Sequence, residues 1–278
     1  MLKKKLAALA AMTGIAAFAA TAIADHSWNN YHIARDSSSF TIQYVDSVSS
    51  QWDSVLAESI QKWGQSNVIG FEQVGADDSS RTRKRCPMIS GQMRVCNDRY
   101  GQNGWLGLAS IGLDSNGHID QGTAKMNDSY DYYWTPAEMN HVMCQEIGHV
   151  FGLGHTSEDG SSQGTCMDYS TSNNSQWPNS HDYQMIEEIY SHLDSYDSFS
   201  QTGDGGGDNG GGGNGCNAPP GKGCNKFGAE LNVPMGLLVH KSKTHETYVA
   251  NRADGGYWVH HVRLAPAKGN APHDDHDH

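Results

Sequence analysis

Two histidines and a glutamate lie close together in the stretch CQEIGHVFGLGH, which runs from Cys144 to His155. Positions i and i+4 of a helix share one face, so Gln145 and His149 can approach the same ion. His155 can join them only if the chain turns back after the helix, and Gly152 suits that reversal. Three protein ligands leave one position of a zinc ion free for water, as catalytic zinc sites require.

A carboxylate follows Gln145 directly. Bound zinc lowers the pKa of a water toward neutrality, and a neighbouring carboxylate can accept the proton that the water releases. Glu146 is placed for this role and is the candidate general base. Gln145 is the unusual member of the set, because a neutral amide oxygen binds zinc more weakly than an imidazole. The sequence therefore predicts a catalytic zinc site with lowered metal affinity.

Two neighbours of Gln145 are poorer candidates for the third ligand. His141 precedes Gln145 by one helical turn, and about 11 Å separate it from His149 on a straight helix. Cys144 faces about 100° away from Gln145, and Cys166 offers it a better partner. The chain has six cysteines, an even number without CxxC spacing, so disulfides are expected instead of a cysteine zinc site. Proximity along the chain predicts the pairs Cys86–Cys96, Cys144–Cys166 and Cys216–Cys224.

The segment from Gln145 to His155 resembles the HExxHxxGxxH signature of the metzincin metalloproteases, with glutamine in the place of the first histidine. Met167 and Tyr169 follow in the segment TCMDY, similar in order and spacing to the methionine turn of that family. The resemblance covers roughly residues 31–193, although its specific motifs lie between Gln145 and Tyr169.

This resemblance implies a secreted zinc endopeptidase that hydrolyses peptide bonds in a protein or peptide substrate. Glu146 would be the general base and Tyr169 a stabiliser of the transition state. Structural Ca²⁺ is a weaker expectation from the same resemblance, because no clear cluster of calcium ligands is present. The ligands of the catalytic Zn²⁺ would be Gln145, His149 and His155.

The resemblance also implies where these groups lie relative to the substrate. Met167 would form an apolar floor beneath the metal. An extended peptide would bind antiparallel to the edge strand of the sheet, within residues 106–113. The alternative for that stretch is an ordinary sheet edge.

The substituted glutamine leaves a second class of function open. In that alternative the domain has lost its metal, or keeps it only for structure, and binds proteins without cleaving them. Glu146, His149 and His155 favour the enzyme, because a site released from its chemistry has no need of the whole set. A third class, a surface or matrix attachment protein, would depend on the C-terminal part of the chain.

A capped helix must carry the central residues of this site. Thr135 can accept hydrogen bonds from the free N–H groups of a helix start, Pro136 suits the first helical position, and Glu138 completes a capping box. The helix should run to about Phe151, where Gly152 ends it. Its apolar stripe, predicted to be buried, consists of Met139, Met143, Ile147 and Val150.

Hydrophobic periodicity predicts the remaining elements. Strands are expected at 40–45, 69–74 and 93–96, and a hairpin at 105–126 with its turn at Asp114-Ser115-Asn116-Gly117. Helices are expected at 51–66 and 180–193. The fold class is therefore α+β, with a twisted, mostly parallel sheet above the helix that carries the site.

Composition divides the chain into four parts. Residues 1–24 combine three lysines, an apolar run and a small-residue cleavage pattern, as secretory signal peptides do. Residues 25–200 form the expected catalytic domain. Residues 201–224 contain the glycine-rich linker QTGDGGGDNGGGGNG. Residues 225–278 form an expected small β-rich appendage with a histidine-rich tail.

Charge and hydropathy restrict the partners. The formal net charge is −12, which argues against nucleic acid, because binding to nucleic acid requires Lys and Arg to neutralise phosphates. No segment after the signal peptide is apolar enough to cross a membrane. We therefore expect a secreted monomer, extracellular or periplasmic.

Overall fold

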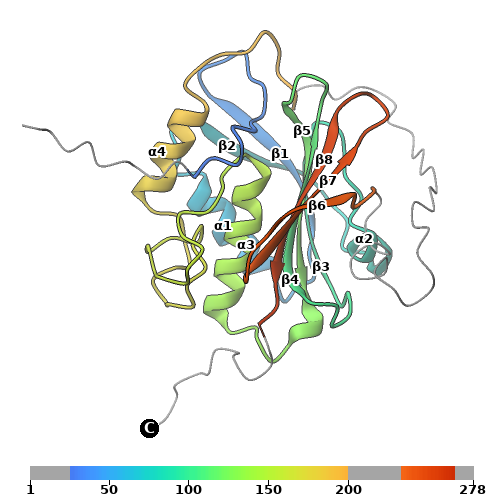
Figure 1. The fold of residues 1–278 in the computed structure, drawn as a ribbon, viewed down its shortest axis with the longest axis vertical. Coiled ribbons are helices and arrows are strands. Elements are labelled where there is room, and N and C mark those ends of the chain that lie inside the picture. The colour runs from blue at the N-terminus through green and yellow to red at the C-terminus, as the bar shows by residue number, and fades with distance from the viewer. Residues whose placement is uncertain (1–25, 200–232, 267–278) are drawn as a thin grey trace, which may run out of the picture.

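The protein has an α+β fold built on one mixed sheet. The computed structural model describes residues 26–199 and 233–266. Figure 1 shows α1, α3 and α4 on one side of the sheet and α2 on the other. The strands are β1 Phe40–Ser47, β2 Ile69–Ala76, β3 Met93–Asp98, β4 Trp105–Leu113, β5 Ile119–Asn127, β6 Leu237–Lys241, β7 His245–Asn251 and β8 Tyr257–Leu264. The helices are α1 Asp53–Trp63, α2 Ser80–Arg85, α3 Pro136–Val150 and α4 Ser180–Ile189, with a short 3-10 helix at Asp128–Tyr130.

The sheet consists of a parallel half and an antiparallel half. Its strand order is β2-β1-β3-β5-β4-β8-β7-β6. Pairing is parallel from β2 to β5 and antiparallel from β5 to β6. The predicted α+β class is confirmed, whereas the expectation of a mostly parallel sheet is wrong, because the three C-terminal strands add antiparallel pairs.

Strand β4 lies inside the sheet. It pairs with β5 on one side and with β8 on the other, in a register that places Ala109 opposite His261. The expectation that residues 106–113 form a sheet edge is therefore wrong. The physical reason is that β8, which is distant in sequence, satisfies the backbone hydrogen-bonding groups of β4 that would otherwise face solvent.

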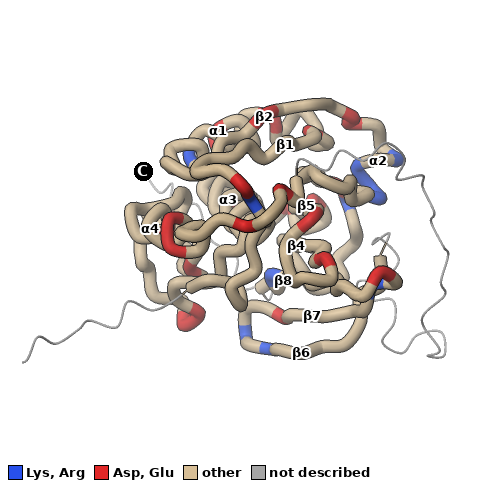
Figure 2. The backbone as a smooth tube through the Cα atoms, turned by 90° about the horizontal axis from the view of Figure 1, so that it is seen from above, with Lys and Arg blue, Asp and Glu red and all other residues tan. Residues whose placement is uncertain are grey.

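The C-terminal region supplies three strands to this same sheet. Figure 2 shows β8, β7 and β6 following β4 in succession. A tight turn joins β7 to β8, and Gly255 within it has a φ of 90°, a conformation that glycine adopts without strain. The predicted signal peptide, glycine-rich linker, histidine-rich tail and Cys216–Cys224 pair lie outside the described residues.

Helix α3 forms as the sequence predicts. The Thr135 side chain accepts a hydrogen bond from the Glu138 N–H at 3.3 Å, and Pro136 is the first helical residue. The carboxylate of Glu138 does not complete the capping box, because it accepts a hydrogen bond from the Tyr133 hydroxyl at 2.7 Å. Gly152 follows with a φ of 101°, and a Cβ there would lie 2.0 Å from the Tyr31 carbonyl oxygen.

The burial of α3 extends beyond the predicted stripe. Almost every residue from Glu138 to Val150 is buried, polar ones included. The helix packs against β4, β5 and α1, while the Met167 loop and β8 supply contacts to its remaining face. Its polar side chains therefore depend on protein partners.

Two of the predicted disulfides are confirmed. Cys86 is bonded to Cys96, and Cys144 is bonded to Cys166. The second bond ties α3 to the loop that contains Met167. A Cβ on Gly148 would lie 2.7 Å from the Met167 sulfur, so this loop packs directly against α3 beside His149.

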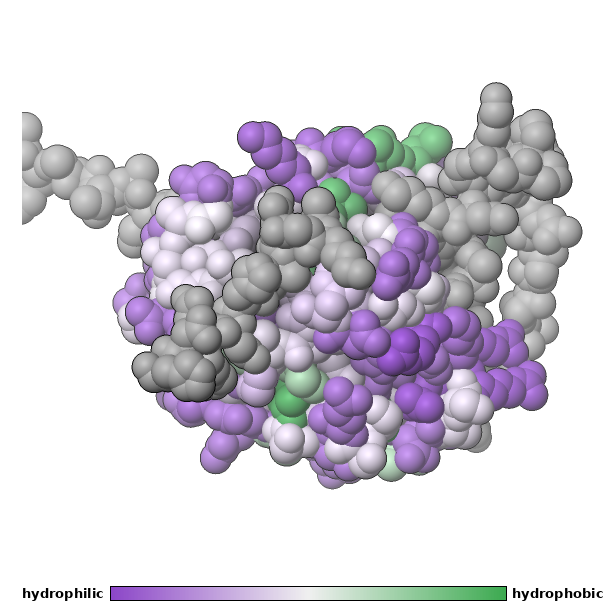
Figure 3. Space-filling model, turned by 90° about the horizontal axis from the view of Figure 1, so that it is seen from below, coloured by the Kyte–Doolittle hydropathy of each residue, from purple (hydrophilic) through white to green (hydrophobic). Residues whose placement is uncertain are grey.

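The described surface is predominantly polar. In the view of Figure 3, hydrophilic residues cover most of the face and hydrophobic residues form small groups. None of the helices in residues 26–199 and 233–266 has both the length and the apolar character needed to span a bilayer.

Helix α4 is anchored by a buried carboxyl group. Asp182 accepts hydrogen bonds from the Asn179 N–H at 2.7 Å and the Thr165 hydroxyl at 2.5 Å. Its other oxygen lies 3.7 Å from the Nε2 atom of His26. Burial raises the pKa of Asp182 to about 6. The ionised carboxylate of Asp182 therefore destabilises the folded protein relative to the protonated carboxyl group.

We expect Asp182→Asn to change how stability depends on pH. The folded pKa of Asp182 lies above its unfolded value, so folded protein binds more protons between about pH 4 and 6 and the contribution of Asp182 to stability falls as pH rises through that window. The loss reaches up to about 3 kcal/mol. Between pH 4 and pH 7 the wild type should lose stability that Asp182→Asn does not lose. The free energy of unfolding of the variant should therefore rise relative to that of the wild type. Urea unfolding at both pH values measures it, and parallel pH profiles would contradict it.

Candidate functional site

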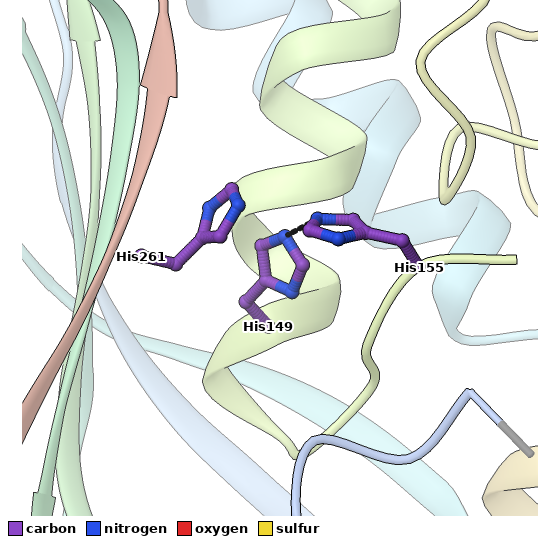
Figure 4. Close-up of side chains that lie close together, drawn as sticks. All are labelled: His149, His155 and His261. Atoms are coloured by element: carbon purple, nitrogen blue, oxygen red, sulfur yellow. Dashed lines mark hydrogen bonds between the residues drawn. The ribbon is translucent and has the colours of Figure 1, made fainter. Parts of the chain in front are cut away.

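Three imidazole rings from separate segments converge beside α3. Figure 4 shows His149 on α3, His155 on the loop after it and His261 on β8. The ring centroids of His149 and His261 are 4.0 Å apart, and those of His155 and His261 are 4.7 Å apart. One nitrogen from each of the three rings lies within 4.8 Å of the others. This separation allows all three rings to contact a single ion.

The partners of His149 and His155 leave their Nε2 atoms available. The Nδ1 atom of His149 donates to the Leu153 carbonyl at 2.7 Å, which assigns the proton to Nδ1 and a lone pair to Nε2. The Nδ1 atom of His155 faces the Glu158 carboxylate at 3.3 Å, with the same result. The two Nε2 atoms lie 3.1 Å apart. Glu158 also lies 3.6 Å from His245 Nε2, so it contacts two imidazoles.

His261 completes the group in the same way. Its Nδ1 atom lies 3.3 Å from the Glu146 carboxylate, and its Nε2 atom lies 2.9 Å from the Tyr169 hydroxyl. A proton on Nδ1 satisfies the carboxylate and leaves the Nε2 lone pair on the side of Tyr169. Each of the three imidazoles is therefore held through Nδ1, and the Nε2 atom of His261 lies within hydrogen-bonding distance of the Tyr169 hydroxyl.

This set of donors fits a zinc ion. Zinc bound to imidazole nitrogens at 2.0–2.1 Å requires nitrogen pairs about 3.3 Å apart in a tetrahedral site, close to the 3.1 Å between His149 and His155. Two lone pairs at that distance repel each other unless a cation lies between them. Burial, with further lowering by neighbouring imidazoles, brings the pKa of His149, His155 and His261 well below the ordinary value. The rings are thus neutral, as metal ligands must be.

The side chain of Gln145 is bonded to protein groups at both ends. Its amide nitrogen donates to the Cys166 carbonyl at 3.0 Å and to the Asp168 carbonyl at 2.9 Å. Its amide oxygen accepts a hydrogen bond from Arg263 at 2.6 Å. Of the three predicted metal ligands, the structure brings His149 and His155 together, and the third imidazole beside them belongs to His261.

Arg263 is a buried cation on the same face of β8 as His261. It lies within hydrogen-bonding distance of His141 Nε2, at 3.2 Å, and its guanidinium carbon is 5.1 Å from the centre of the Tyr169 ring. Burial lowers the pKa of Arg263, but Tyr133 and the buried carboxylates Glu138 and Glu146 outweigh it and keep the pKa raised. Alternation along β8 turns His260 to the opposite face, where it contacts Ser110 at 2.8 Å.

Glu146 lies at the closest approach of α3 to β4. Burial raises the pKa of Glu146 to about 7, while the nearby His149 and Arg263 side chains oppose that increase. Its Oε1 atom has no hydrogen-bond partner among the described atoms. A Cβ on Gly107 would lie 2.3 Å from this oxygen and 2.8 Å from Val142. Glycine at position 107 is therefore required for the carboxylate to occupy its place.

Tyr169 contacts two of the three imidazoles. Its hydroxyl lies 3.1 Å from His155 Nε2 and 2.9 Å from His261 Nε2. Burial raises the pKa of Tyr169 well above its ordinary value, so the hydroxyl keeps its proton and remains a hydrogen-bond donor. The predicted position of Tyr169 beside the site is therefore the one observed.

A cavity of ≈ 430 Å³ opens beside the imidazoles. Its walls come from three parts of the chain: the segment before β1, the end of α3 with the loop after it, and strands β6 to β8. The lining residues are His26, Ser27, Trp28, Asn29, His149, Gly154, His155, Glu158, Val239, His240, His245, Thr247 and His261.

His261 is the residue of this group that the sequence did not predict. Its signal is the pair of adjacent histidines in the strand YWVHHVRL, where alternation places one of them on each face. That signal becomes informative only when β8 is known to pair with β4. No family model, curated protein or solved structure matches the chain, so the assignment depends on the geometry of the site.

We expect His261→Ala to lower zinc affinity at least about 10-fold, because one of three neutral nitrogen donors is lost. Gln145→Ala should change zinc affinity less than His261→Ala, since the amide is bonded to Cys166, Asp168 and Arg263. Competition with a chromophoric chelator measures both affinities.

The matched control is His260→Ala, which removes a buried imidazole from the adjacent position on the opposite face of β8. Its zinc affinity should remain that of the wild type. If Gln145→Ala lowers zinc affinity more than His261→Ala does, Gln145 and not His261 is the third ligand.

We expect Gly107→Ala to destabilise the protein by about 1–3 kcal/mol, as overpacking of a buried contact does. The added methyl group would displace Glu146 or Val142. Gly75→Ala on β2 is the control, because a Cβ there makes ordinary contacts of 3.7 and 3.8 Å with Val45. Denaturant unfolding measures both variants, and equal stabilities would show that Gly107 is not sterically required.

Proposed function

We propose that the chain is a secreted zinc-dependent endopeptidase of the metzincin type, with the metal held by His149, His155 and His261. The observation that carries this proposal is the convergence of three imidazole rings: one nitrogen of each lies within 4.8 Å of the others, and the Nε2 atoms of His149 and His155 are 3.1 Å apart. The resemblance of residues 145–169 to the metzincin motifs supports it. The proposed third ligand comes from β8 and not from Gln145.

The residues around the imidazoles match the tasks of peptide hydrolysis. A zinc ion at this site would acidify water and polarise a substrate carbonyl. Glu146 would accept the proton of the attacking water and deliver it to the leaving amine, a role suited to a buried carboxylate that lies beside His261. Tyr169, a protonated donor beside two imidazoles, would hydrogen-bond to the oxygen that gains negative charge.

The apolar surroundings support the same assignment. Met167 is fully buried and packs against Gly148, one residue before His149. It would therefore form the apolar floor that the metzincin resemblance implies. The bond between Cys144 and Cys166 fixes this floor to α3, so the ligand-bearing helix and the Met167 loop cannot separate.

Substrate must approach through the cavity. Because β8 already pairs with β4, a peptide cannot add to β4 at residues 106–113. The cavity reaches His149, His155 and His261 between Trp28 on one side and the β6–β7 strands on the other. We place the bound peptide in this opening.

Export of the chain is part of the proposal. Disulfides persist in oxidising compartments and are rare in the reducing cytosol, and the described residues contain two disulfides and no free cysteine. The signal-like composition of residues 1–24 supports the same location.

A binding module without catalysis is the second candidate. Two contacts favour this candidate. One oxygen of Glu146 contacts His261 and is therefore not free to bind a water, and β8 pairs with β4 where a peptide substrate would otherwise add to the sheet. In that case the metal would link β8 to α3 and the cavity would hold a partner without cleaving it.

We expect Glu146→Gln to reduce hydrolysis of an unstructured protein substrate at least about 100-fold, the low end for loss of a general base. Zinc content should stay equal to that of the wild type, because the amide oxygen of the new Gln side chain can still accept a hydrogen bond from His261 Nδ1. Release of new amino termini by zinc-loaded protein measures activity, and elemental analysis measures zinc.

The control is Glu187→Gln on α4, a side chain that hydrogen-bonds Asn67 on the surface. This variant should retain wild-type activity. Negligible and equal hydrolysis by zinc-loaded wild type and Glu146→Gln would support the binding module.

A further inference from the structure

A second group of metal-binding side chains lies outside the catalytic site. It brings together His32 from the segment before β1, His118 from the β4–β5 turn, and His192 with Asp194 from the segment after α4. In Figure 1 the segment after α4 passes across the top of the molecule toward the β4–β5 turn. We propose that these four residues form a second, structural site for Zn²⁺. This inference does not depend on the proposed peptidase function.

One ligand atom each of His32, His118 and Asp194 lies within 4.8 Å of the others, and His192 lies beside His32 and Asp194. The Nε2 atoms of His32 and His192 are 3.1 Å apart. The Asp194 carboxylate lies 3.6 Å from His32 Nε2, 3.5 Å from His118 Nε2 and 3.8 Å from His192 Nε2. These distances are near the separation of about 3.3 Å that tetrahedral zinc requires between nitrogen or oxygen donors. His32, His118 and Asp194 would supply three ligands to such an ion, and His192, whose side chain is 53% exposed, would supply the fourth.

Hydrogen bonds at the far side of two rings orient their Nε2 atoms. His32 Nδ1 donates to the Asn30 carbonyl at 2.9 Å. His118 Nδ1 lies 2.7 Å from the Tyr196 hydroxyl, which itself donates to Asp114, so the histidine must be the donor. Both Nε2 atoms therefore carry lone pairs and face the Asp194 carboxylate.

Lone pairs directed at a carboxylate repel it, and a shared cation removes that repulsion. The side chains of His32, His118 and Asp194 are only 12%, 19% and 11% exposed, so water screens them poorly. Asp194 is fixed in place by the Arg35 N–H, which donates to its carboxylate at 3.0 Å, and by its own N–H, which donates to the Arg35 carbonyl at 2.7 Å. The group is thus ordered by bonds beyond the ligands, as metal sites are.

The position of the site suggests what a bound ion would stabilise. It would join the segment before β1 to the sheet and to the segment after α4. The same N-terminal segment includes Trp28, whose ring lies 5.5 Å from His149 and lines the catalytic cavity. An ion at the second site would therefore hold one wall of that cavity.

Protonated histidines around Asp194 are the competing explanation for the cluster. Asp114 and Tyr196 face His118, and the Asp194 carboxylate faces all three imidazoles, so acid could also stabilise the group. This explanation predicts a response to pH without a response to zinc.

The stoichiometry of bound zinc tests the proposal. All proteins are full-length chains in which His273, His276 and His278 are replaced by Gln, so that the histidine-rich tail does not contribute zinc. After zinc loading and dialysis at pH 7.5, the parent should retain two equivalents. Asp194→Asn and, separately, His118→Gln should each retain one.

His261→Ala isolates the second site from the proposed catalytic site. This variant should retain one equivalent, and zinc should raise its thermal midpoint by several degrees. His261→Ala with Asp194→Asn should retain none and show no such rise. His181→Gln, which alters an imidazole on α4 outside both groups, is the control and should retain two equivalents.

Three results would overturn the proposal. One is a parent protein with a single equivalent that Asp194→Asn leaves in place. Another is a midpoint of His261→Ala that responds to pH but not to zinc. The third is a cobalt-loaded His261→Ala protein that lacks the visible absorption of a tetrahedral ion. The second and third results do not test the catalytic site, because that site is disabled in His261→Ala, and the first leaves the catalytic site its single equivalent.

Discussion

The register between β8 and β4 determines which side chains reach α3. Ala109 lies opposite His261, and Gly107 lies opposite Arg263. Because successive residues of a strand face opposite sides of a sheet, a slip of one residue would turn His261 and Arg263 away from α3 and direct His260 toward it. The buried contacts of Arg263 with Gln145 and of His261 with Tyr169 exist only in the observed register. Those contacts in turn favour that register over its neighbours.

The glutamine at position 145 can be understood together with this strand. An amide both donates and accepts, so Gln145 can bond to two carbonyl groups while its oxygen accepts from Arg263. An imidazole has fewer hydrogen-bonding groups and could not satisfy all three partners. In the proposed site, β8 therefore supplies a histidine for the metal and an arginine for the glutamine. In that site, Gln145 of α3 and the strand β8 belong to one arrangement.

Local sequence signals predicted most of the fold. They did not predict the long-range pairing of β8 with β4, which brings His261 to the site. The Thr135 cap predicted α3, the Asp114–Gly117 turn predicted the β4–β5 hairpin, and cysteine proximity predicted two disulfides. Each of these signals lies within a short stretch of sequence. Strands β4 and β8 lie on either side of the glycine-rich segment in the sequence. The pairing of strands so far apart cannot be predicted from the residues of either strand alone. His149, His155 and Glu146 were accordingly predicted from their spacing and Tyr169 from the metzincin resemblance, whereas His261 was identified only in the structure.

The separation of 115 positions between Glu146 and His261 has a consequence for the order in which the protein is made. A ribosome completes α3, the Met167 loop and α4 well before it adds β8, so a nascent chain has only two of the three imidazoles. In the proposed enzyme, full metal affinity would arise at the end of synthesis, when the last strand joins the sheet. The proposed peptidase would therefore have an incomplete metal site throughout the synthesis of α3 and α4.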